Sequence, residues 1–193
     1  AAPAPLALPP LTILALGELE PEIARAVARA AERELGAKAE IILDPDFRPS
    51  SFGRIVGTHR QFEDIAIAAD VARQHPDRAG RFRQSATIAL VDRDLYAHGL
   101  NFVWASMVRE GFSLVSVPRL AGEDAGLTRA RVAKQALTSI LDWMGAPRPT
   151  HPRCVNAVNL TVGEFDAKDS YVCAETRLYL TDKRVKARVA RAG

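Results

Sequence analysis

The sequence predicts an α/β protein in which helices pack on a mixed β-sheet. Short apolar segments bounded by proline or glycine alternate along the chain with longer segments whose apolar residues recur at helical spacing. This alternation is typical of strands and helices that pack in layers around one core. No internal repeat or composition break divides the chain, so we expect one domain over residues 11–193, preceded by a flexible Ala/Pro-rich lead at residues 1–10.

The first half of the chain is expected to alternate regularly between strands and helices. In order, the expected elements are a strand over residues 11–17, a helix over residues 21–35, a strand over residues 38–43, a loop over residues 44–57, a helix over residues 60–74 and a strand over residues 85–91. The first helix is the best marked, because Pro21 stands at its start, Glu22 in its first turn and Gly36 after its end. The loop is predicted from its proline, glycine and serine content.

The second half of the chain is dominated by one long helix. A strand over residues 113–117 ends at Pro118, and the helix follows from about Leu127 to Met144, where Gly145 and three prolines interrupt it. Residues 175–189 are expected to form a short strand or helix with many cations.

Composition narrows the classes of function. The chain has 193 residues, of which 48% are hydrophobic and 25% charged, and these fractions are typical of a folded domain with one sizeable core. The formal charge of +3 is too small for a dedicated nucleic-acid binder, and no apolar run reaches the roughly 20 residues that span a bilayer. The lead resembles what remains after a signal peptide is removed, which favours a periplasmic or secreted protein over a cytoplasmic one.

The order of several short motifs resembles the archaemetzincins, a zinc-peptidase family of the metzincin clan. The motifs are DRDLYAHGLNF, SLVSVPRL, RVAK at a helix start, a helix-Gly-loop-Cys segment, a late cysteine, and Arg60-Gln61-Phe62, which is similar to an Arg-x-Gln-aromatic helix start. The resemblance covers roughly residues 11–180. It implies a zincin fold, in which a twisted mixed sheet packs on a backing helix and on a former active-site helix.

The chain departs from the family at the catalytic metal site. The family signature is His-Glu-x-x-His-x-x-Gly-x-x-His-Cys, in which three histidines bind zinc and the glutamate is the general base. With Gly145 as the register, Thr138 and Asp142 stand at the first two histidines, Ser139 at the glutamate and Arg148 at the third histidine. A hydroxyl, a carboxylate and a guanidinium are a poor zinc site, so we expect no metal and no cofactor here.

The second, structural zinc site of the family is also incomplete. The resemblance places Pro149, Cys154, Cys173 and Thr176 at its four cysteine positions, and Asn156 where the family has the methionine beneath the catalytic metal. Residues that read as scaffold are retained, and they are Asp94, Leu95, Tyr96, Gly99, Leu100, Asn101, Phe102, Arg119 and Leu120. The pattern therefore predicts a conserved fold without the family's zinc chemistry.

The resemblance predicts two pairings of side chains, a salt bridge and a disulfide. Positions 142 and 148 converge on one metal in the parent fold, so Asp142 and Arg148 are expected to form a salt bridge, the alternative being an arginine that points to water. Cys154 and Cys173 once shared a zinc ion and are expected to form a disulfide if the protein is exported, the alternative being two reduced thiols.

Other side chains allow weaker alternatives. His151 with the two cysteines could form a makeshift metal site, and Ser139 with Asp142 could suggest a nucleophile, although the ordinary interpretation is that these polar residues lie on the exposed side of an amphipathic helix. We expect Trp104 and Trp143 in the core or in a cleft wall. The remaining histidines are expected at the surface, and they are His59, His75 and His98.

Together these features predict a catalytically inactive, archaemetzincin-like protein that binds an extended peptide or a protein partner in a cleft between the sheet edge and the long helix. One alternative is a hydrolase with a non-standard metal site. Another is a nucleic-acid-associated module that uses the basic tail, defined by Lys183, Arg184, Lys186, Arg188 and Arg191. The ligand and the oligomeric state do not follow from these residues.

Overall fold

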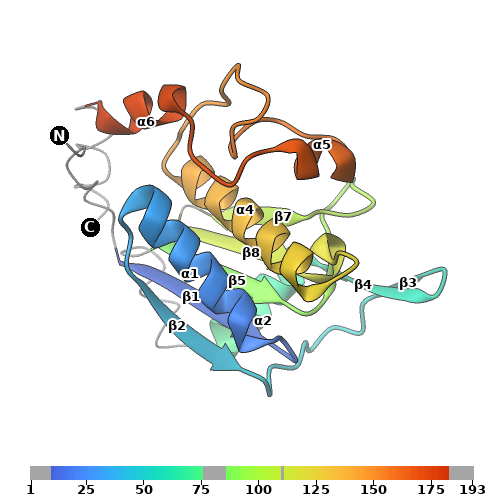
Figure 1. Cartoon of the computed structure of the whole chain (residues 1–193). Coiled ribbons are helices and arrows are strands. Elements are labelled where there is room, and N and C mark those ends of the chain that lie inside the picture. The colour runs from blue at the N-terminus through green and yellow to red at the C-terminus, as the bar shows by residue number, and fades with distance from the viewer. Residues whose placement is uncertain (1–9, 76–85, 110, 183–193) are drawn as a thin grey trace.

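A five-stranded sheet with helices on both faces forms the body of the protein in the computed structural model, which describes residues 10–75, 86–109 and 111–182 (Figure 1). The strands follow the order β2-β1-β5-β8-β7, and they are β1 (Leu11–Leu16), β2 (Ala39–Asp44), β5 (Ala86–Val91), β8 (Phe112–Ser116) and β7 (Ala105–Arg109). The first four are parallel, and β7 runs antiparallel to β8 at the edge. The predicted mixed sheet and α/β class are thus confirmed.

The helices divide between the two faces of the sheet. They are α1 (Pro21–Leu35), α2 (Asp64–Gln74), α4 (Ala125–Trp143), α5 (Val162–Ala167), α6 (Ala174–Thr181) and the short 3-10 helix η2 (Pro118–Leu120). Helices α1 and α4 pack against each other and share a buried cluster with β1 and β5, while α2 belongs to the cluster on the opposite face. Helices α5 and α6 lie on the α1–α4 side (Figure 1).

Strand β1 shows how the sequence produces these layers. Its six residues are all buried, and successive side chains point to opposite faces. Ile13 packs in the cluster of α1 and α4, whereas Leu14 packs in the cluster of α2. A strand covered on both faces therefore needs the continuous apolar run that the sequence shows here.

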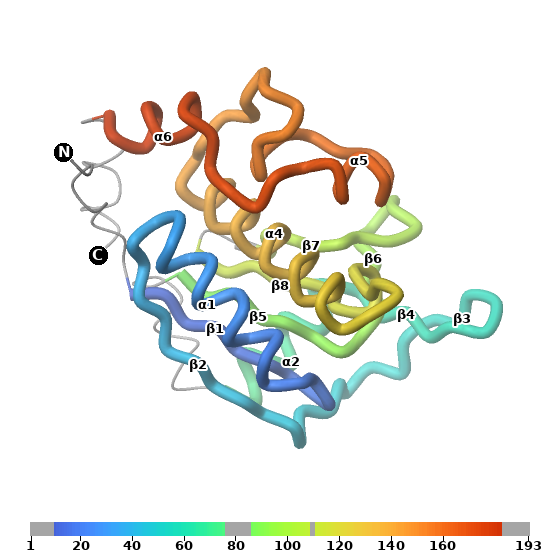
Figure 2. Tube along the Cα trace, in the orientation of Figure 1, coloured from blue at the N-terminus to red at the C-terminus, as the bar shows by residue number. Residues whose placement is uncertain are grey.

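A smaller three-stranded sheet lies beside the main one. Its strands β3 (Arg54–Val56), β4 (His59–Glu63) and β6 (Asp94–Tyr96) pair in that order, and the β3–β4 hairpin extends away from the body (Figure 2). The two predictions for this region were therefore partly wrong. Residues 54–56 of the expected loop form β3, and residues 60–63 of the expected helix form β4, so that Arg60-Gln61-Phe62 is a strand and not a helix start.

The hydrogen bonds of Gln61 explain why this segment is extended. Its side chain is buried and donates from Nε2 to the Asp94 carboxylate and to the Asn101 carbonyl, each at 3.1 Å. Pairing of β4 with β6 aligns Gln61 with Asp94, and this tertiary contact overrides the helical spacing of the local sequence. The retained scaffold residue Arg119 completes the cluster through Nη2, which lies 2.8 Å from Oδ2 of Asp94.

The other element predictions agree with the structure within a few residues. The first helix has the predicted bounds, the long helix begins two residues early, and α5 was not predicted. Within the described residues, no helix is both long enough and apolar enough to cross a membrane. The Ala/Pro-rich lead up to residue 9, Ser85 and the basic tail lie outside the described residues.

Candidate functional site

Helix α4 and the loop that follows it position the residues that the resemblance assigns to the catalytic metal site. Asp124 caps the helix by accepting a hydrogen bond from the Leu127 amide at 2.8 Å. At the other end Gly145 has a φ of 72°, a left-handed conformation that glycine adopts without steric cost, and the chain turns back there. This turn brings Arg148 alongside the last turn of α4.

Asp142 and Arg148 form the predicted salt bridge. Nη2 of Arg148 lies 2.7 Å from Oδ2 of Asp142, while Nη1 donates to the side-chain and backbone oxygens of Asn156 at 2.8 and 3.2 Å. Burial raises the pKa of the Asp142 carboxyl, and the nearby Arg148 charge opposes that rise. The structure thus brings together Asp142, Arg148 and Asn156, which the resemblance assigns to two zinc ligands and to the methionine position.

Thr138 lies one turn before Asp142 on α4 and is buried. Its hydroxyl lies 2.8 Å from the Val155 carbonyl oxygen and 3.1 Å from the Lys134 carbonyl oxygen. Ser139 is also buried. The alternative that these residues lie on the exposed side of the helix is therefore wrong for Thr138 and Ser139, which are both buried.

Two lysines are buried next to these residues, and sequence reasoning did not identify them. Lys134 on α4 is 8% exposed and donates to the Lys168 and Asp166 carbonyl oxygens at 2.6 and 3.2 Å. Lys168 is 4% exposed and donates to the Val155 carbonyl oxygen at 3.3 Å. Burial lowers the pKa of both ammonium groups, that of Lys168 to about 8, and the positive charges of Arg148 and Lys134 add to the effect at Lys168.

The position of Lys134 in the sequence could have indicated that it is buried. It lies four residues before Thr138 and three before Leu137 on the same helix, so the spacing places an ammonium beside buried positions. Lys168 follows α5, a helix that the sequence analysis missed, and no local pattern marks it as buried.

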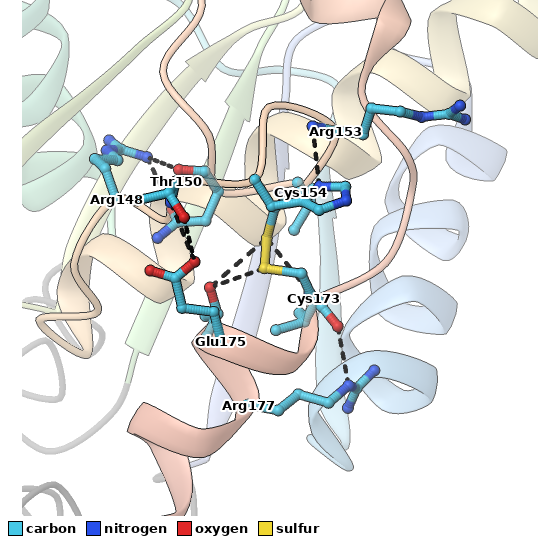
Figure 3. Close-up of a disulfide and its surroundings, with 12 residues drawn as sticks. Arg148, Thr150, Arg153, Cys154, Cys173, Glu175 and Arg177 are labelled. Carbon is cyan, nitrogen blue, oxygen red and sulfur yellow. Dashed lines mark hydrogen bonds between the residues drawn. A yellow bond between two sulfur atoms is a disulfide. The ribbon is translucent and has the colours of Figure 1, made fainter.

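The former structural zinc site holds the predicted disulfide. Cys154 and Cys173 are joined, with their Cα atoms 5.2 Å apart, and the Thr176 hydroxyl lies 3.6 Å from Sγ of Cys154 and 3.4 Å from Sγ of Cys173 (Figure 3). Three of the four predicted positions therefore converge. The fourth position is Pro149. The next residue, Thr150, contacts helix α6, because its amide and hydroxyl donate hydrogen bonds to the Glu175 carboxylate at 3.1 and 3.2 Å.

The makeshift metal site proposed for His151 is not formed. Both cysteine sulfurs are in the disulfide, and Nδ1 of His151 accepts a hydrogen bond from the Arg153 amide at 3.2 Å. Across the described part of the chain, His, Cys, Asp and Glu side chains form no group of three that could hold a metal ion. His75, which we expected at the surface, is instead partly buried beside Asp44, with Nε2 3.0 Å from Oδ2.

A cleft of about 410 Å³ opens beside Thr138 and Arg148. It lies between the start of the edge strand β7, helix α4 and the loop before α5. Its lining residues are Leu100, Phe102, Val103, Trp104, Ala105, Gln135, Thr138, Arg148, Ala157, Val158, Asn159 and Leu160. The expected cleft between sheet edge and helix is present, with Trp104 in its wall as predicted, whereas Trp143 packs against the core.

Comparisons with known proteins give a consistent relationship. The chain is 32% identical over 90 residues to a curated archaemetzincin from Archaeoglobus fulgidus, and the match spans 46% of this chain and 56% of that relative. No model of a known protein family matches the chain.

Solved structures match nearly the whole chain. A zinc-dependent peptidase from Methanocorpusculum labreanum superposes with a TM-score of 0.74 and 19% identity, covering 89% of this chain and 100% of its own. The archaemetzincin from Archaeoglobus fulgidus complexed with malonate superposes with a TM-score of 0.67 and 23% identity, covering 88% of this chain and 98% of its own. The archaemetzincin from Methanopyrus kandleri superposes with a TM-score of 0.65 and 21% identity, covering 100% of this chain and 98% of its own. At these identities the structures establish the fold.

Proposed function

The chain is related to the archaemetzincins in sequence and has their fold, and from this premise we propose that it binds an extended peptide or protein segment in its cleft without hydrolysing it. The proposal separates the fold, which the chain shares with these relatives, from the zinc chemistry, which depends on side chains that the chain has replaced.

The Asp142–Arg148 ion pair is the observation that carries the proposal. In the register given by Gly145, both residues stand at zinc-ligand positions, and the carboxylate that could bind a cation already contacts the guanidinium. Arginine stays protonated at any ordinary pH and repels a dication. The hydroxyl of Thr138 is directed to two carbonyl oxygens, so the donor set present does not fit zinc.

Strand β7 supports the binding part of the proposal. It is the last strand in the sheet, its one paired side contacts β8, and its first residue, Ala105, lines the cleft opposite α4. The backbone of an edge strand can accept an extended peptide as an additional strand, with side-chain pockets providing selectivity. A protein that keeps this cleft while lacking a metal-activated water would bind such a peptide and release it intact.

The proposal can be tested by incubating the protein with a mixed library of random octapeptides. Peptides that co-elute with the protein in size-exclusion chromatography are identified by mass spectrometry, which reports binding and cleavage in one sample. We expect a recurring set of bound, uncut peptides. Cleaved peptides would favour the alternative of a hydrolase, and the absence of any bound peptide would refute the binding function.

Two exposed leucines provide matched variants. Leu160 lines the cleft and is 82% exposed, whereas Leu178 on α6 is 73% exposed and is not part of the cleft lining. We expect Leu160→Asp to abolish peptide enrichment and Leu178→Asp to leave it unchanged. Equal effects of the two substitutions would place the binding surface elsewhere.

A further inference from the structure

More positive than negative charge surrounds Lys168, next to the cleft residue Arg148. Arg148 and Lys134 are the cations that act on its ammonium, and Asp142 is the carboxylate. The two other carboxylates that act on the lysines already face arginines. Asp166 is held by Arg131 at 2.6 Å, and Asp169 is held by Arg153 at 2.6 Å.

Within the described residues, the carboxylates that act on the two buried lysines are each already paired with an arginine. Their ammonium groups donate to carbonyl oxygens, which solvate the charge without cancelling it. Burial is the main cause of the lowered pKa of Lys168, and repulsion from the positive charges of Arg148 and Lys134 lowers it further. An anion nearby would relieve this repulsion.

Arg148 is the cation that a ligand in the cleft can reach. Its side chain is 40% exposed and lines the cleft, whereas both lysine side chains are buried behind it. The guanidinium has five N–H donors, and its three hydrogen bonds to Asn156 and Asp142 leave donors for a ligand carboxylate. The cleft therefore offers one contact point for an anion, and the charge of the buried Lys168 adds to the positive potential near it.

The walls around this contact point are apolar and open to solvent. Large exposed side chains gather there, and they are Leu100, Phe102, Val158 and Leu160. A ligand that matches both features carries a carboxylate next to an apolar group. The C-terminal residue of a peptide has this arrangement, since its free carboxylate and its side chain are attached to the same carbon atom.

We propose that the cleft binds the C-terminal end of a peptide, with the free carboxylate at Arg148 and an apolar last side chain against the walls. This inference rests on the proposed peptide-binding function and specifies which peptides are bound. It also assigns a use to the residue at the third histidine position, because the positive charge that a metal supplies in a zinc peptidase is supplied here by Arg148.

The test compares three fluorescein-labelled pentapeptides by fluorescence anisotropy. Two have the sequence Gly-Ser-Ala-Val-Leu and end in a carboxylate or a carboxamide, and the third ends in a serine carboxylate. We expect the leucine carboxylate to bind at least about tenfold more tightly than either of the others, because each lacks one of the two contacts. N-acetyl-leucine serves as a competitor and should displace the peptide only weakly.

Variants identify the residue responsible. Arg148→Gln should reduce the preference for the carboxylate to less than about twofold, whereas Arg25→Gln, at an ion-paired arginine on α1 outside the cleft, should preserve it. Asp142→Asn removes the carboxylate that competes for the guanidinium and should tighten binding of the acid. Circular dichroism checks that each variant is folded, and the acid-to-amide comparison on the unaltered protein needs no variant.

Each outcome has a defined meaning. Equal affinity for the acid and the amide would overturn this inference and leave peptide binding intact. Binding of neither peptide, together with an empty octapeptide screen, would overturn both proposals. If N-acetyl-leucine competes as well as the pentapeptide, the site is one for small carboxylic acids and the inference of a peptide terminus is wrong.

Discussion

The guanidinium of Arg148 reaches back across the turn at Gly145 and contacts the carboxylate of Asp142 at 2.7 Å, so that a loop residue and a helix residue meet where the resemblance places two zinc ligands. The same guanidinium binds the side chain of the buried Asn156. One arginine thus ties helix α4, its return loop and the position beneath the former metal. A metal ion at the two ligand positions would connect the helix and the return loop through coordination bonds.

The first prediction concerns the strength of this pair. Both side chains are partly exposed, at 40% for Arg148 and 30% for Asp142, so solvent screens the attraction. A double-mutant cycle with Asp142→Asn and Arg148→Gln, measured by urea unfolding, is expected to give a coupling energy of about 0.5 to 1 kcal/mol. A coupling energy near zero would show that the contact does not stabilise the fold. The loss of unfolding free energy in the single variant Arg148→Gln is expected to exceed the coupling energy, because Arg148 also binds Asn156.

The second prediction concerns pH and the buried Lys168. Its folded pKa is about 8, below the ordinary value of 10.5. Below pH 8 the ammonium is protonated in both states, whereas between about 8 and 10.5 the unfolded chain binds the proton more strongly than the folded protein. Stability therefore rises with pH across this window, and the contribution of Lys168 is expected to be about 2 to 3 kcal/mol.

Comparison with Lys168→Met isolates this effect from all other titrations. The quantity to measure is the unfolding free energy of the unaltered protein minus that of the variant, at pH 7 and at pH 10.5. We expect this difference to increase with pH. A difference that stays constant would mean that Lys168 has an ordinary pKa, and one that decreases would mean that its charge is stabilised by an anion.

Much of the main sheet and its helices could be predicted from the sequence, because strands such as β1 are continuous apolar runs and α1 has a proline start and a glycine end. Strand β4 could not, since its conformation depends on Gln61 reaching Asp94 and Asn101, which are 33 and 40 residues away. Of the site, the resemblance predicted the positions that converge. The buried charge of Lys168 was missed because its burial depends on contacts with Lys134 and Val155, which are distant in the sequence.

The third prediction concerns the disulfide. Cys154 and Cys173 close a loop over a sequence separation of 19, and removing such a link is expected to lower the unfolding free energy by about 3 kcal/mol. Urea unfolding with and without a phosphine reductant measures this loss. The double variant Cys154→Ala, Cys173→Ala is the control, and its midpoint should not respond to the reductant. A free-thiol assay on the unreduced, unfolded protein should detect no thiol.

The last prediction tests the register that assigns the former metal site. If Thr138, Asp142 and Arg148 stand where three histidines once converged, then the triple variant Thr138→His, Asp142→His, Arg148→His should bind zinc. Imidazoles one turn apart on α4 share a face, and the turn at Gly145 returns the third toward them. The buried ammonium of Lys168 would repel the ion, so adding Lys168→Met should strengthen binding.

Metal analysis by mass spectrometry after dialysis against zinc should give about one zinc ion per molecule of the triple variant. Two controls are used. The unaltered protein has none of the three imidazoles, and the double variant Thr138→His, Asp142→His lacks the third. A folded triple variant that retains no zinc would show that the three positions do not converge as the register requires, and equal zinc in the unaltered protein would show that its present side chains suffice.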